Sequence, residues 1–216
     1  FNGSWWKITN GRVDFDFSGL AENAYGWWKI TNGQVDFGYV GYEQNGSNWW
    51  YVYGGQVCFQ ATDVLPGTVG GQYGWWKVCE GKVNFDDDVC ENTYGWWKIT
   101  TGKVDFQYTG LAQNACGWWM IQNGHVNFGS NGLVDNGNGW WLVRNGGVDF
   151  NYNGLVDNGN GWWLIRNGYV DFNYNGLVDN GNGWWLVKNG CVDFSYQGYV
   201  QNECGVWWVS NGQVQF

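Results

Sequence analysis

The sequence has almost no proline or histidine and no long apolar run. Pro66 is its only proline and His125 its only histidine. A Ser-His-Asp triad is therefore implausible, and one histidine gives little support to a zinc site. No stretch approaches about 18 consecutive apolar residues and no basic-then-apolar leader opens the chain. Neither a transmembrane helix nor a retained signal peptide is expected.

Positive charge is also scarce. The 216 residues carry 10 Lys and Arg against 19 Asp and Glu, which gives a net charge of −9. A protein that binds nucleic acid or an anionic membrane normally presents a basic patch. Polyanionic partners are thus disfavoured, whereas neutral glycans, cationic groups and protein surfaces remain open.

Catalytic and metal sites find no support in the remaining residues. Carboxylates recur once or twice per repeat, and no pair stands out as an acid and a base in distinct environments. The stretch from Asp135 to Gly139 and its copies faintly resemble a calcium loop, but Gly137 and Gly139 bring no side-chain oxygen. We expect no enzyme activity, no metal and no cofactor.

Tryptophan is what the chain has in abundance, and it is strictly ordered. All 20 tryptophans fall in adjacent pairs, about 22 residues apart, within units such as GWWKITNGQVDF. Periodic self-similarity of this kind indicates a repeat architecture. The pairs begin at Trp5, Trp27, Trp49, Trp75, Trp96, Trp118, Trp140, Trp162, Trp184 and Trp207.

Each unit predicts a β-hairpin. Asn32-Gly33 lies between two short β-prone runs, and a two-residue turn with positive φ at both positions closes such hairpins. The register would place Ile30 opposite Val35 and, further out, Lys29 opposite Asp36 as an exposed charge pair. Trp28, Ile30, Val35 and Phe37 would then form the core face, because side chains alternate along a strand.

A lone hairpin is marginal in water, so each unit must cover its neighbour. We therefore predict an all-β fold, a β-solenoid of about ten tandem β-hairpin repeats, as a single array over residues 1-216. Because the chain starts in mid-unit, we expect a fragment of a longer surface protein. Residues 60-73 lack Trp and read as an irregular surface loop, and the units within 132-197 are near-identical.

Six cysteines allow 15 pairings, but a solenoid brings only neighbouring units together. Cys191 would reach only Cys204. The other four would pair most simply as Cys58 with Cys79 and Cys90 with Cys116. Disulfides of this kind would favour an oxidising, extracellular setting.

The first tryptophan of each pair is the main candidate for binding. It lies on the face of the hairpin opposite the core. Exposed aromatic residues at regular spacing are unfavourable in water unless another surface covers them. Either the next hairpin covers them, or they flank grooves that stack sugars or hold a quaternary ammonium group. The candidates are Trp27, Trp49, Trp96, Trp118, Trp140, Trp162 and Trp184.

The near-identical units offer a second candidate surface. Leucine replaces Lys29 there, and a basic residue takes the Thr31 position. Together these residues would form a repeated apolar and basic epitope for a protein partner. They are Leu142, Arg144, Leu164, Arg166, Leu186 and Lys188.

The motifs GWWKITNGQVDF and NWWYVYGGQVCF resemble the cell-wall-binding repeats of bacterial surface proteins, the choline-binding and glucan-binding superfamily. The resemblance implies a β-solenoid, secretion or display on a Gram-positive bacterium, and noncovalent binding of choline, polysaccharide or host ligands. The Trp that completes a choline cage in that family is replaced in most units, for example by Leu20 and Leu111. Tyr42 and Tyr199 mark the positions best suited to choline.

We accordingly expect a nonenzymatic binding array whose ligand is a cell-envelope or host glycan stacked on outward aromatic residues. Capture of a host protein, immunoglobulin or another glycoprotein, is the first alternative. A passive structural stalk is the second.

Overall fold

The computed structural model describes residues 3–216, which fold into β-strands and turns without a helix. It therefore holds no helix that could cross a membrane within those residues. The chain forms two compact units. One runs up to Tyr108 and includes Asn123–His125, and the other comprises Thr109–Gln122 and Val126–Phe216.

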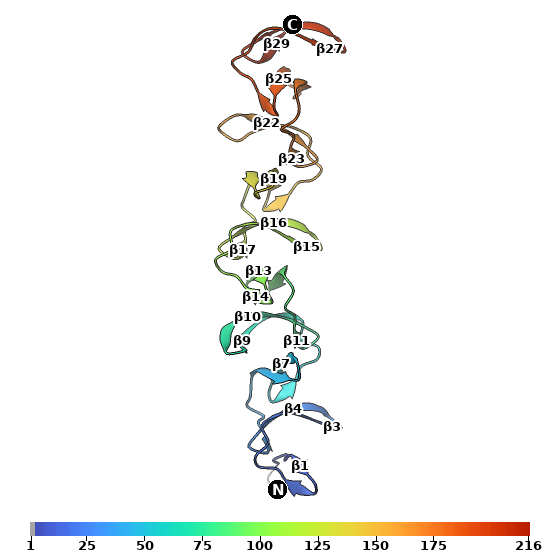
Figure 1. Cartoon of the computed structure of the whole chain (residues 1–216), viewed down its shortest axis with the longest axis vertical. Coiled ribbons are helices and arrows are strands. Elements are labelled where there is room, and N and C mark those ends of the chain that lie inside the picture. The colour runs from blue at the N-terminus through green and yellow to red at the C-terminus, as the bar shows by residue number, and fades with distance from the viewer. Residues whose placement is uncertain (1–2) are drawn as a thin grey trace. The chain divides into compact units, whose positions relative to one another are not determined.

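Each complete repeat contributes three strands, which we call the leading strand, the tryptophan strand and the short strand (Figure 1). The leading strands are β3 (Gly19–Asn23), β6 (Gly41–Asn45), β9 (Asp63–Val69), β12 (Asp88–Asn92), β15 (Gly110–Asn114), β18 (Gly132–Asp135), β21 (Gly154–Asp157), β24 (Gly176–Asp179) and β27 (Gln197–Asn202). The tryptophan strands are β4 (Gly26–Thr31), β7 (Asn48–Tyr53), β10 (Gln72–Cys79), β13 (Gly95–Thr100), β16 (Gly117–Gln122), β19 (Trp140–Arg144), β22 (Trp162–Arg166), β25 (Trp184–Lys188) and β28 (Gly205–Ser210), with β1 (Ile8–Thr9) at this place in the first repeat. The short strands are β2 (Arg12–Val13), β5 (Gln34–Val35), β8 (Gln56–Val57), β11 (Lys82–Val83), β14 (Lys103–Val104), β17 (His125–Val126), β20 (Gly147–Val148), β23 (Tyr169–Val170), β26 (Cys191–Val192) and β29 (Gln213–Gln215).

The predicted turn joins the tryptophan strand to the short strand. Thr31 pairs with Gln34 and Ile30 with Val35, which confirms the register near the turn. Asn32 has φ 50° and Gly33 has φ 79°, the left-handed pair that this tight turn requires.

The longer hairpin in each repeat was missed by the sequence analysis. It joins the leading strand to the tryptophan strand, with Glu22 opposite Trp27 and Ala21 opposite Trp28. Its turn is stabilised by the Asn23 side chain, whose Oδ1 accepts hydrogen bonds from the Tyr25 amide at 2.8 Å and the Trp28 indole at 3.1 Å. The hairpin that the NG turn closes is therefore the smaller part of the repeat.

Successive repeats are joined through the backbone. Trp28 pairs with Gln56 of the next repeat, and the Lys29 amide donates to the Gly55 carbonyl at 2.8 Å. The Gly55 amide in turn donates to the carbonyl of Tyr39, in the linker between the two repeats, at 3.0 Å. In each unit the sheet is thus an open ladder of stacked hairpins, which confirms the predicted all-β solenoid.

Aliphatic residues make the core. Ile30 is 3% exposed and Val35 is 7% exposed, as predicted. Phe37 was predicted to join them but is 44% exposed. The reason is that the short strand ends at Val35, after which the chain turns and carries Phe37 outward.

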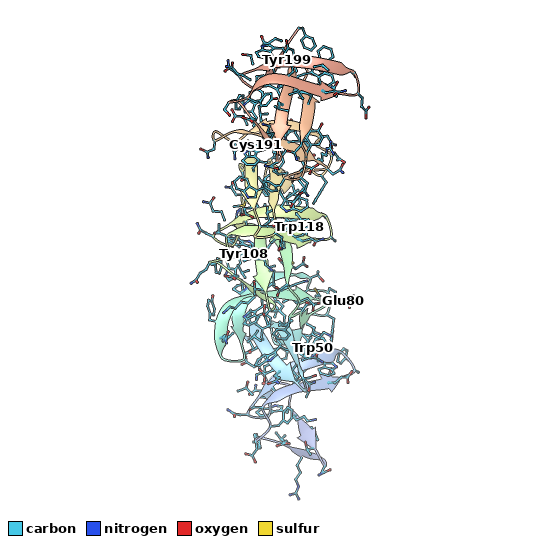
Figure 2. The ribbon with its side chains drawn as sticks, turned by 45° about the horizontal axis from the view of Figure 1, so that its top comes forward. Trp50, Glu80, Tyr108, Trp118, Cys191 and Tyr199 are labelled. Atoms are coloured by element: carbon cyan, nitrogen blue, oxygen red, sulfur yellow. The ribbon has the colours of Figure 1, made fainter. Side chains whose placement is uncertain are left out.

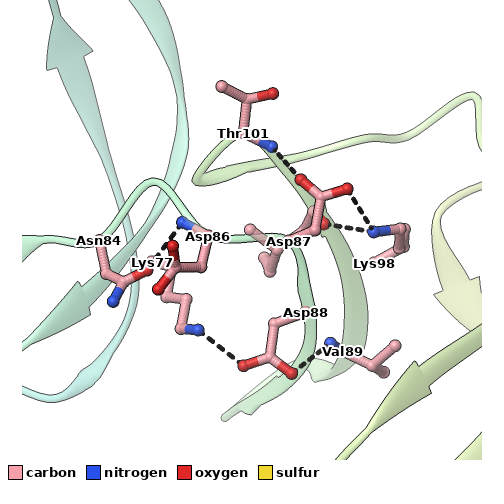
Figure 3. A network of polar contacts seen from close by, with 9 residues as sticks. Lys77, Asn84, Asp86, Asp87, Asp88, Val89, Lys98 and Thr101 are labelled. Atoms are coloured by element: carbon pink, nitrogen blue, oxygen red, sulfur yellow. Dashed lines mark hydrogen bonds and ion pairs between the residues drawn. The ribbon is translucent and has the colours of Figure 1, made fainter.

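The predicted charge pairs within a repeat do not form as expected. Lys29 Nζ instead lies 2.7 Å from Glu43 Oε2 of the next repeat. In the same way Lys77 Nζ contacts Asp88 Oδ2 at 2.7 Å (Figure 3). The lysine reaches the neighbouring leading strand, which the sequence analysis had not recognised, so these pairs connect repeats.

Residues 60-73 are not the irregular loop that we predicted. They contain β9, which pairs with β10 across a Gly70-Gly71 turn. Val64 and Val69 are each 3% exposed and belong to the core. Pro66 is tolerated because β9 pairs along one side only, where a missing amide donor costs no ladder bond.

The predicted disulfides are also wrong. All six cysteines are free thiols: Cys58, Cys79, Cys90, Cys116, Cys191 and Cys204. Neighbouring repeats are close in space, but this does not bring the two β-carbons of a predicted pair to bonding distance. The cysteines consequently give no support to an oxidising setting.

Candidate functional site: aromatic trios between repeats

Three aromatic rings converge where one repeat meets the next. They are the first Trp of one repeat and the second Trp and the Phe of the following repeat, which we call an aromatic trio. In one example, Trp75 lies 5.5 Å from Trp97 and 6.2 Å from Phe106, measured between ring centroids. Trp97 and Phe106 are 5.5 Å apart. The trio therefore exists only when two repeats are stacked.

The strand geometry explains this convergence. The two tryptophans of a pair point to opposite faces, so the first can face the following repeat while the second faces the preceding one. Trp97 is fixed in that direction because its indole Nε1 donates to Asn92 Oδ1 at 3.0 Å. Phe106 is carried outward by the same bend that exposes Phe37. The arrangement leaves Phe106 48% exposed at the rim.

The trio recurs along the chain. Trp5 lies 4.9 Å from Trp28 and 5.8 Å from Phe37, and Trp162 lies 4.9 Å from Trp185 and 5.8 Å from Phe194. First and second tryptophans of consecutive repeats also meet at 6.1 Å in Trp27–Trp50, 6.4 Å in Trp118–Trp141 and 5.9 Å in Trp140–Trp163.

One trio borders an open groove of about 330 Å³. Trp49, Trp76 and Phe85 supply its rings, and Gln72, Thr100 and Lys103 add polar groups. Lys103 Nζ lies 5.8 Å from the centroid of the Trp76 ring, so a cation stands beside an aromatic face. Aromatic faces next to hydrogen-bonding side chains are what a sugar ring needs for stacking and orientation.

In the last repeat the tryptophan pair is shifted by one residue, so that Trp207 takes the place of a second Trp. The trio that it completes borders a smaller and more enclosed cavity of about 100 Å³. Trp184, Trp207 and Phe216 supply its rings, and Leu177, Val214 and Cys204 complete the lining. Apart from the Cys204 thiol, every lining side chain is apolar at its surface, since the Trp207 indole N–H is bonded to Asn202 at 2.9 Å. This cavity therefore suits a group without hydrogen-bonding needs.

The predicted first-Trp residues are all half-buried rather than freely exposed. A tryptophan of the next repeat packs against Trp27, Trp118, Trp140 and Trp162, in agreement with the packing interpretation. The second tryptophans and the phenylalanines were not predicted as site residues. Their common 22-residue period with the first tryptophans was the available signal.

Of the two tyrosines proposed for choline, one is wrongly placed. Tyr42 is 4% exposed, and its hydroxyl donates to the Leu65 carbonyl at 2.9 Å, so it is a core residue. Tyr199 is 70% exposed and packs against Trp208 at 5.0 Å (Figure 2). Only Tyr199 is available to a ligand.

The predicted protein-binding surface loses its apolar half. Leu142, Leu164 and Leu186 are 3–4% exposed, because each packs against aliphatic core residues of the following repeat, as Leu142 does against Ile165 and Val170. A leucine that is buried in the core cannot form an epitope.

The basic half of that surface is present and well ordered. Arg144 Nη1 lies 3.3 Å from Asp149 Oδ2, and its guanidinium stacks 4.2 Å above the Tyr152 ring. The next two repeats repeat this arrangement, at 3.3 Å and 4.5 Å in Arg166–Asp171–Tyr174 and at 3.0 Å and 4.3 Å in Lys188–Asp193–Tyr196. Each cation is already paired, so the local charge is close to neutral.

The titratable groups whose pKa values are shifted take part in hydrogen bonds or packing that stabilise the fold. Hydrogen bonds from Ser195 and then Lys188 hold the pKa of the Asp193 carboxyl below its usual range. Desolvation of the Cys90 thiol raises its pKa to about 12, which leaves it protonated at neutral pH. Within residues 3–216, no cluster of three or more His, Cys, Asp or Glu residues could hold a metal ion.

Comparison with known proteins agrees with this architecture. The choline-binding repeat model matches five segments: residues 16–36, 107–127, 129–149, 151–171 and 173–193. Comparison with curated proteins gives no match.

Among solved structures, choline-binding protein F from Streptococcus pneumoniae is similar at 20% identity and a TM-score of 0.36. That match covers 85% of this chain and 61% of the other, so the chain spans about three fifths of its length. A structure of the same protein with ipratropium is 19% identical over 85% of this chain and 63% of the other, with a TM-score of 0.36.

An alternansucrase in complex with isomaltononaose is 12% identical, with a TM-score of 0.33. The match covers 99% of this chain and only 16% of that enzyme. Repeats of the matched kind are binding modules and typify bacterial cell-surface proteins. The predicted resemblance is thus confirmed: five repeats of this chain match the choline-binding repeat family.

Proposed function

We propose that this chain is a nonenzymatic array that binds a cell-envelope or host glycan at its aromatic trios. The observation that carries the proposal is the groove of about 330 Å³ lined by Trp49, Trp76 and Phe85. It combines aromatic faces with the polar groups of Gln72 and Lys103. The choline-binding repeats support a ligand of the bacterial envelope, choline included.

Repetition would add to the affinity of such sites. Stacking on one aromatic face contributes modestly, and a polymer that engages several sites gains effective concentration without new contacts. A repeated array therefore suits a polymeric glycan better than a small free sugar. Envelope polysaccharides and host mucin glycans are both polymers of that kind.

The experiment is retention of the whole chain on a panel of envelope and host glycans and on choline resin. Trp49→Leu and Phe85→Leu each replace an aromatic ring of the groove with a smaller side chain that is still apolar. The amount of the chain that is retained on the glycan should fall about tenfold or more. Tyr53→Ala is the matched control, because Tyr53 is 64% exposed but lines no trio.

A second variant set separates glycan binding from host-protein capture. Arg144→Ala, Arg166→Ala and Lys188→Ala together remove the basic surface, and glycan retention should stay unchanged. Loss of serum or mucus protein retention in this triple variant, with no glycan retained by the parent, would replace the proposal with protein capture. Silence of the parent chain in every assay would instead indicate a passive stalk.

A further inference from the structure

We propose that the DNGNG turns are sites of self-catalysed deamidation, where the chain converts Asn136, Asn158 and Asn180 into acidic residues. Each turn joins a leading strand to its tryptophan strand. Its backbone requires glycine after the asparagine, because Gly137 has φ 85°. Asparagine is a chemically labile residue, and a following glycine offers no Cβ to hinder ring closure. The turn thus imposes a reactive Asn-Gly pair on the sequence.

The reaction needs no partner other than water. The backbone nitrogen of Gly137 loses its proton and attacks the side-chain carbon Cγ of Asn136, which closes a succinimide ring. The bond from Cγ to Nδ2 breaks, and the leaving nitrogen takes up the proton and departs as ammonia. Water then opens the ring at either carbonyl, which leaves aspartate or isoaspartate at position 136.

A carboxylate is in place to remove that proton. The Gly137 amide donates to Asp135 Oδ1 at 2.8 Å, within the distance at which a general base acts. The carboxyl that has taken the proton can then return it to the leaving nitrogen, so Asp135 serves as base and then as acid. The same bond is present in the two copies, at 2.8 Å from Gly159 to Asp157 and at 2.9 Å from Gly181 to Asp179.

A second hydrogen bond prepares the group under attack. Asn136 Oδ1 accepts the Asn138 amide at 3.0 Å, and Asn158 and Asn180 accept the corresponding amides at the same distance. Negative charge develops on this oxygen as the nitrogen adds to Cγ, and a backbone N–H at this distance stabilises it. The bond also turns the Asn136 side chain toward the peptide that follows it. The carbonyl of Asn136 is therefore both oriented and polarised.

The NG turn of the same repeats provides an internal comparison. There the glycine is buried, and its amide donates to a linker carbonyl, at 2.9 Å from Gly146 to Ser130. A carbonyl oxygen is a far weaker base than a carboxylate. Gly137 is by contrast exposed, and no heavy atom beyond its chain neighbours lies within 4 Å of a Cβ placed on it. The protected pairs are Asn145-Gly146, Asn167-Gly168 and Asn189-Gly190.

Two further kinds of Asn-Gly pair lack one of these features. Asn138 precedes a glycine, but no carboxylate in residues 3–216 accepts the Gly139 amide. Asn153 also precedes a glycine, but its Nδ2 donates to the Asn151 carbonyl at 3.2 Å and its Oδ1 accepts the Asn167 amide at 3.0 Å. Ring closure at Asn153 would break both bonds. Asn136 and its two copies are therefore the reactive positions.

The reaction changes the charge of the array. Each event replaces a neutral amide with a carboxylate in an exposed turn, so the complete series makes a net charge of −9 still more negative. Aspartate keeps an oxygen that can accept the Asn138 amide, whereas isoaspartate inserts a further carbon into the main chain and breaks the turn. The negative charge of the folded array should accordingly grow with time.

The test incubates the whole folded chain at neutral pH and follows each site by mass spectrometry. Trypsin cuts after Arg144, Arg166 and Lys188, so each DNGNG turn falls in its own peptide, and fragment ions locate the converted residue. The three proposed sites should convert about tenfold or more faster than the NG turns, and faster than in the same chain unfolded in urea. Equal rates in the two kinds of turn, or slower conversion in the folded chain, would overturn the proposal.

Asp135→Asn tests the base within one molecule. The variant removes the carboxylate from one turn but keeps a side-chain oxygen that can accept the Gly137 amide. Conversion of Asn136 should slow by about tenfold or more. Asn158 and Asn180 keep their carboxylates, so parent rates at these two sites show that the array is still folded. An unchanged rate at Asn136 beside parent rates at the two copies would contradict the proposal.

Discussion

Gly33 in the turn of the second repeat packs directly on Asp14 in the linker after the first repeat. A Cβ on Gly33 would overlap the carbonyl oxygen of Asp14 and lie 2.9 Å from Phe15 Cα. The same close approach recurs in later repeats, for example between Gly55 and the Asp36 carbonyl. Glycine is therefore needed here for stacking as well as for the turn.

This relationship predicts a difference between two chemically identical substitutions. Gly11 and Gly33 have φ of 77° and 79°, but a Cβ on Gly11 meets nothing within 4 Å. Gly11→Ala should cost about 1 kcal/mol for the left-handed backbone. Gly33→Ala should cost about 1–3 kcal/mol more, because the linker backbone must move. Chemical denaturation measures the free energy of unfolding of both variants. Equal losses of stability would show that the contact between the turn and the linker does not hold the repeats together.

Thr101 offers a stabilising substitution. It occupies the first turn position with φ 49°, where seven repeats use asparagine. A β-branched residue is strained in this region, whereas asparagine tolerates it. Thr101→Asn should raise the free energy of unfolding by about 0.5–1 kcal/mol. The reverse change, Asn32→Thr, should lower the free energy of unfolding by a similar amount, and urea unfolding measures both variants. A loss of stability in Thr101→Asn would show that the backbone of Thr101 is not strained.

The Lys77–Asp88 ion pair predicts a dependence of stability on pH. Burial of the Asp88 carboxyl alone would raise its pKa, but bonds from Lys77 and the Val89 amide hold that pKa below its usual range. A lowered pKa contributes stability above the ordinary carboxyl range, and the contribution is lost as pH falls through the lowered pKa.

Asp88→Asn should therefore destabilise the chain by about 1 kcal/mol at neutral pH, a modest figure because the pair is partly exposed. The difference from the parent should shrink toward zero as the pH falls below the lowered pKa. Urea unfolding at pH 7 and at acidic pH measures it. A difference that stays constant across this range would show that the carboxylate is not responsible.

The thiols should divide by reactivity. Cys116 and Cys204 are exposed, whereas Cys90 is partly buried with a pKa of about 12. Because the thiolate is the reacting species, Cys90 should react far more slowly with a thiol reagent than the two exposed cysteines. Mass spectrometry after brief labelling identifies the sites. If no thiol of the unreduced chain reacted with the reagent, the result would instead support the disulfides that the sequence predicted.

The sequence predicted the fold well where a local signal was strong. The Asn-Gly turn identified the smaller hairpin, its register and the burial of Ile30 and Val35. The leading strand was missed because in repeats such as the second its turn, Asn23-Ala24-Tyr25-Gly26, has no Asn-Gly or Asp-Gly signature and depends on the Asn23 side chain. Asn136-Gly137 and its copies do carry that signature, but they were not interpreted as the turn of a second hairpin. Residues 60-73 were misread for another reason: Pro66 outweighed a Gly70-Gly71 turn that does indicate a hairpin.

The site was predicted in part. The first tryptophans were recognised from their period, and the structure places Trp162, for example, in a trio. Their role in ligand binding stays a prediction. Tyr42 and Leu142 were misplaced because each is buried by the core of the following repeat, and the sequence did not show which side chains face that repeat. The contribution of Phe85 and its counterparts could not be predicted from alternation, since the short strand ends before them and the bend decides their direction.

The central claim is that ligands lie between two repeats, against the first Trp of one and the second Trp and Phe of the next. Crystallography of the chain with the best-retained glycan of the panel tests it most directly. The account predicts a sugar ring in the groove, stacked on Trp49 or Phe85 and within hydrogen-bond distance of Gln72 or Lys103. A sugar bound only at the Arg144–Tyr152 surface, with the Trp49 groove empty, would contradict it.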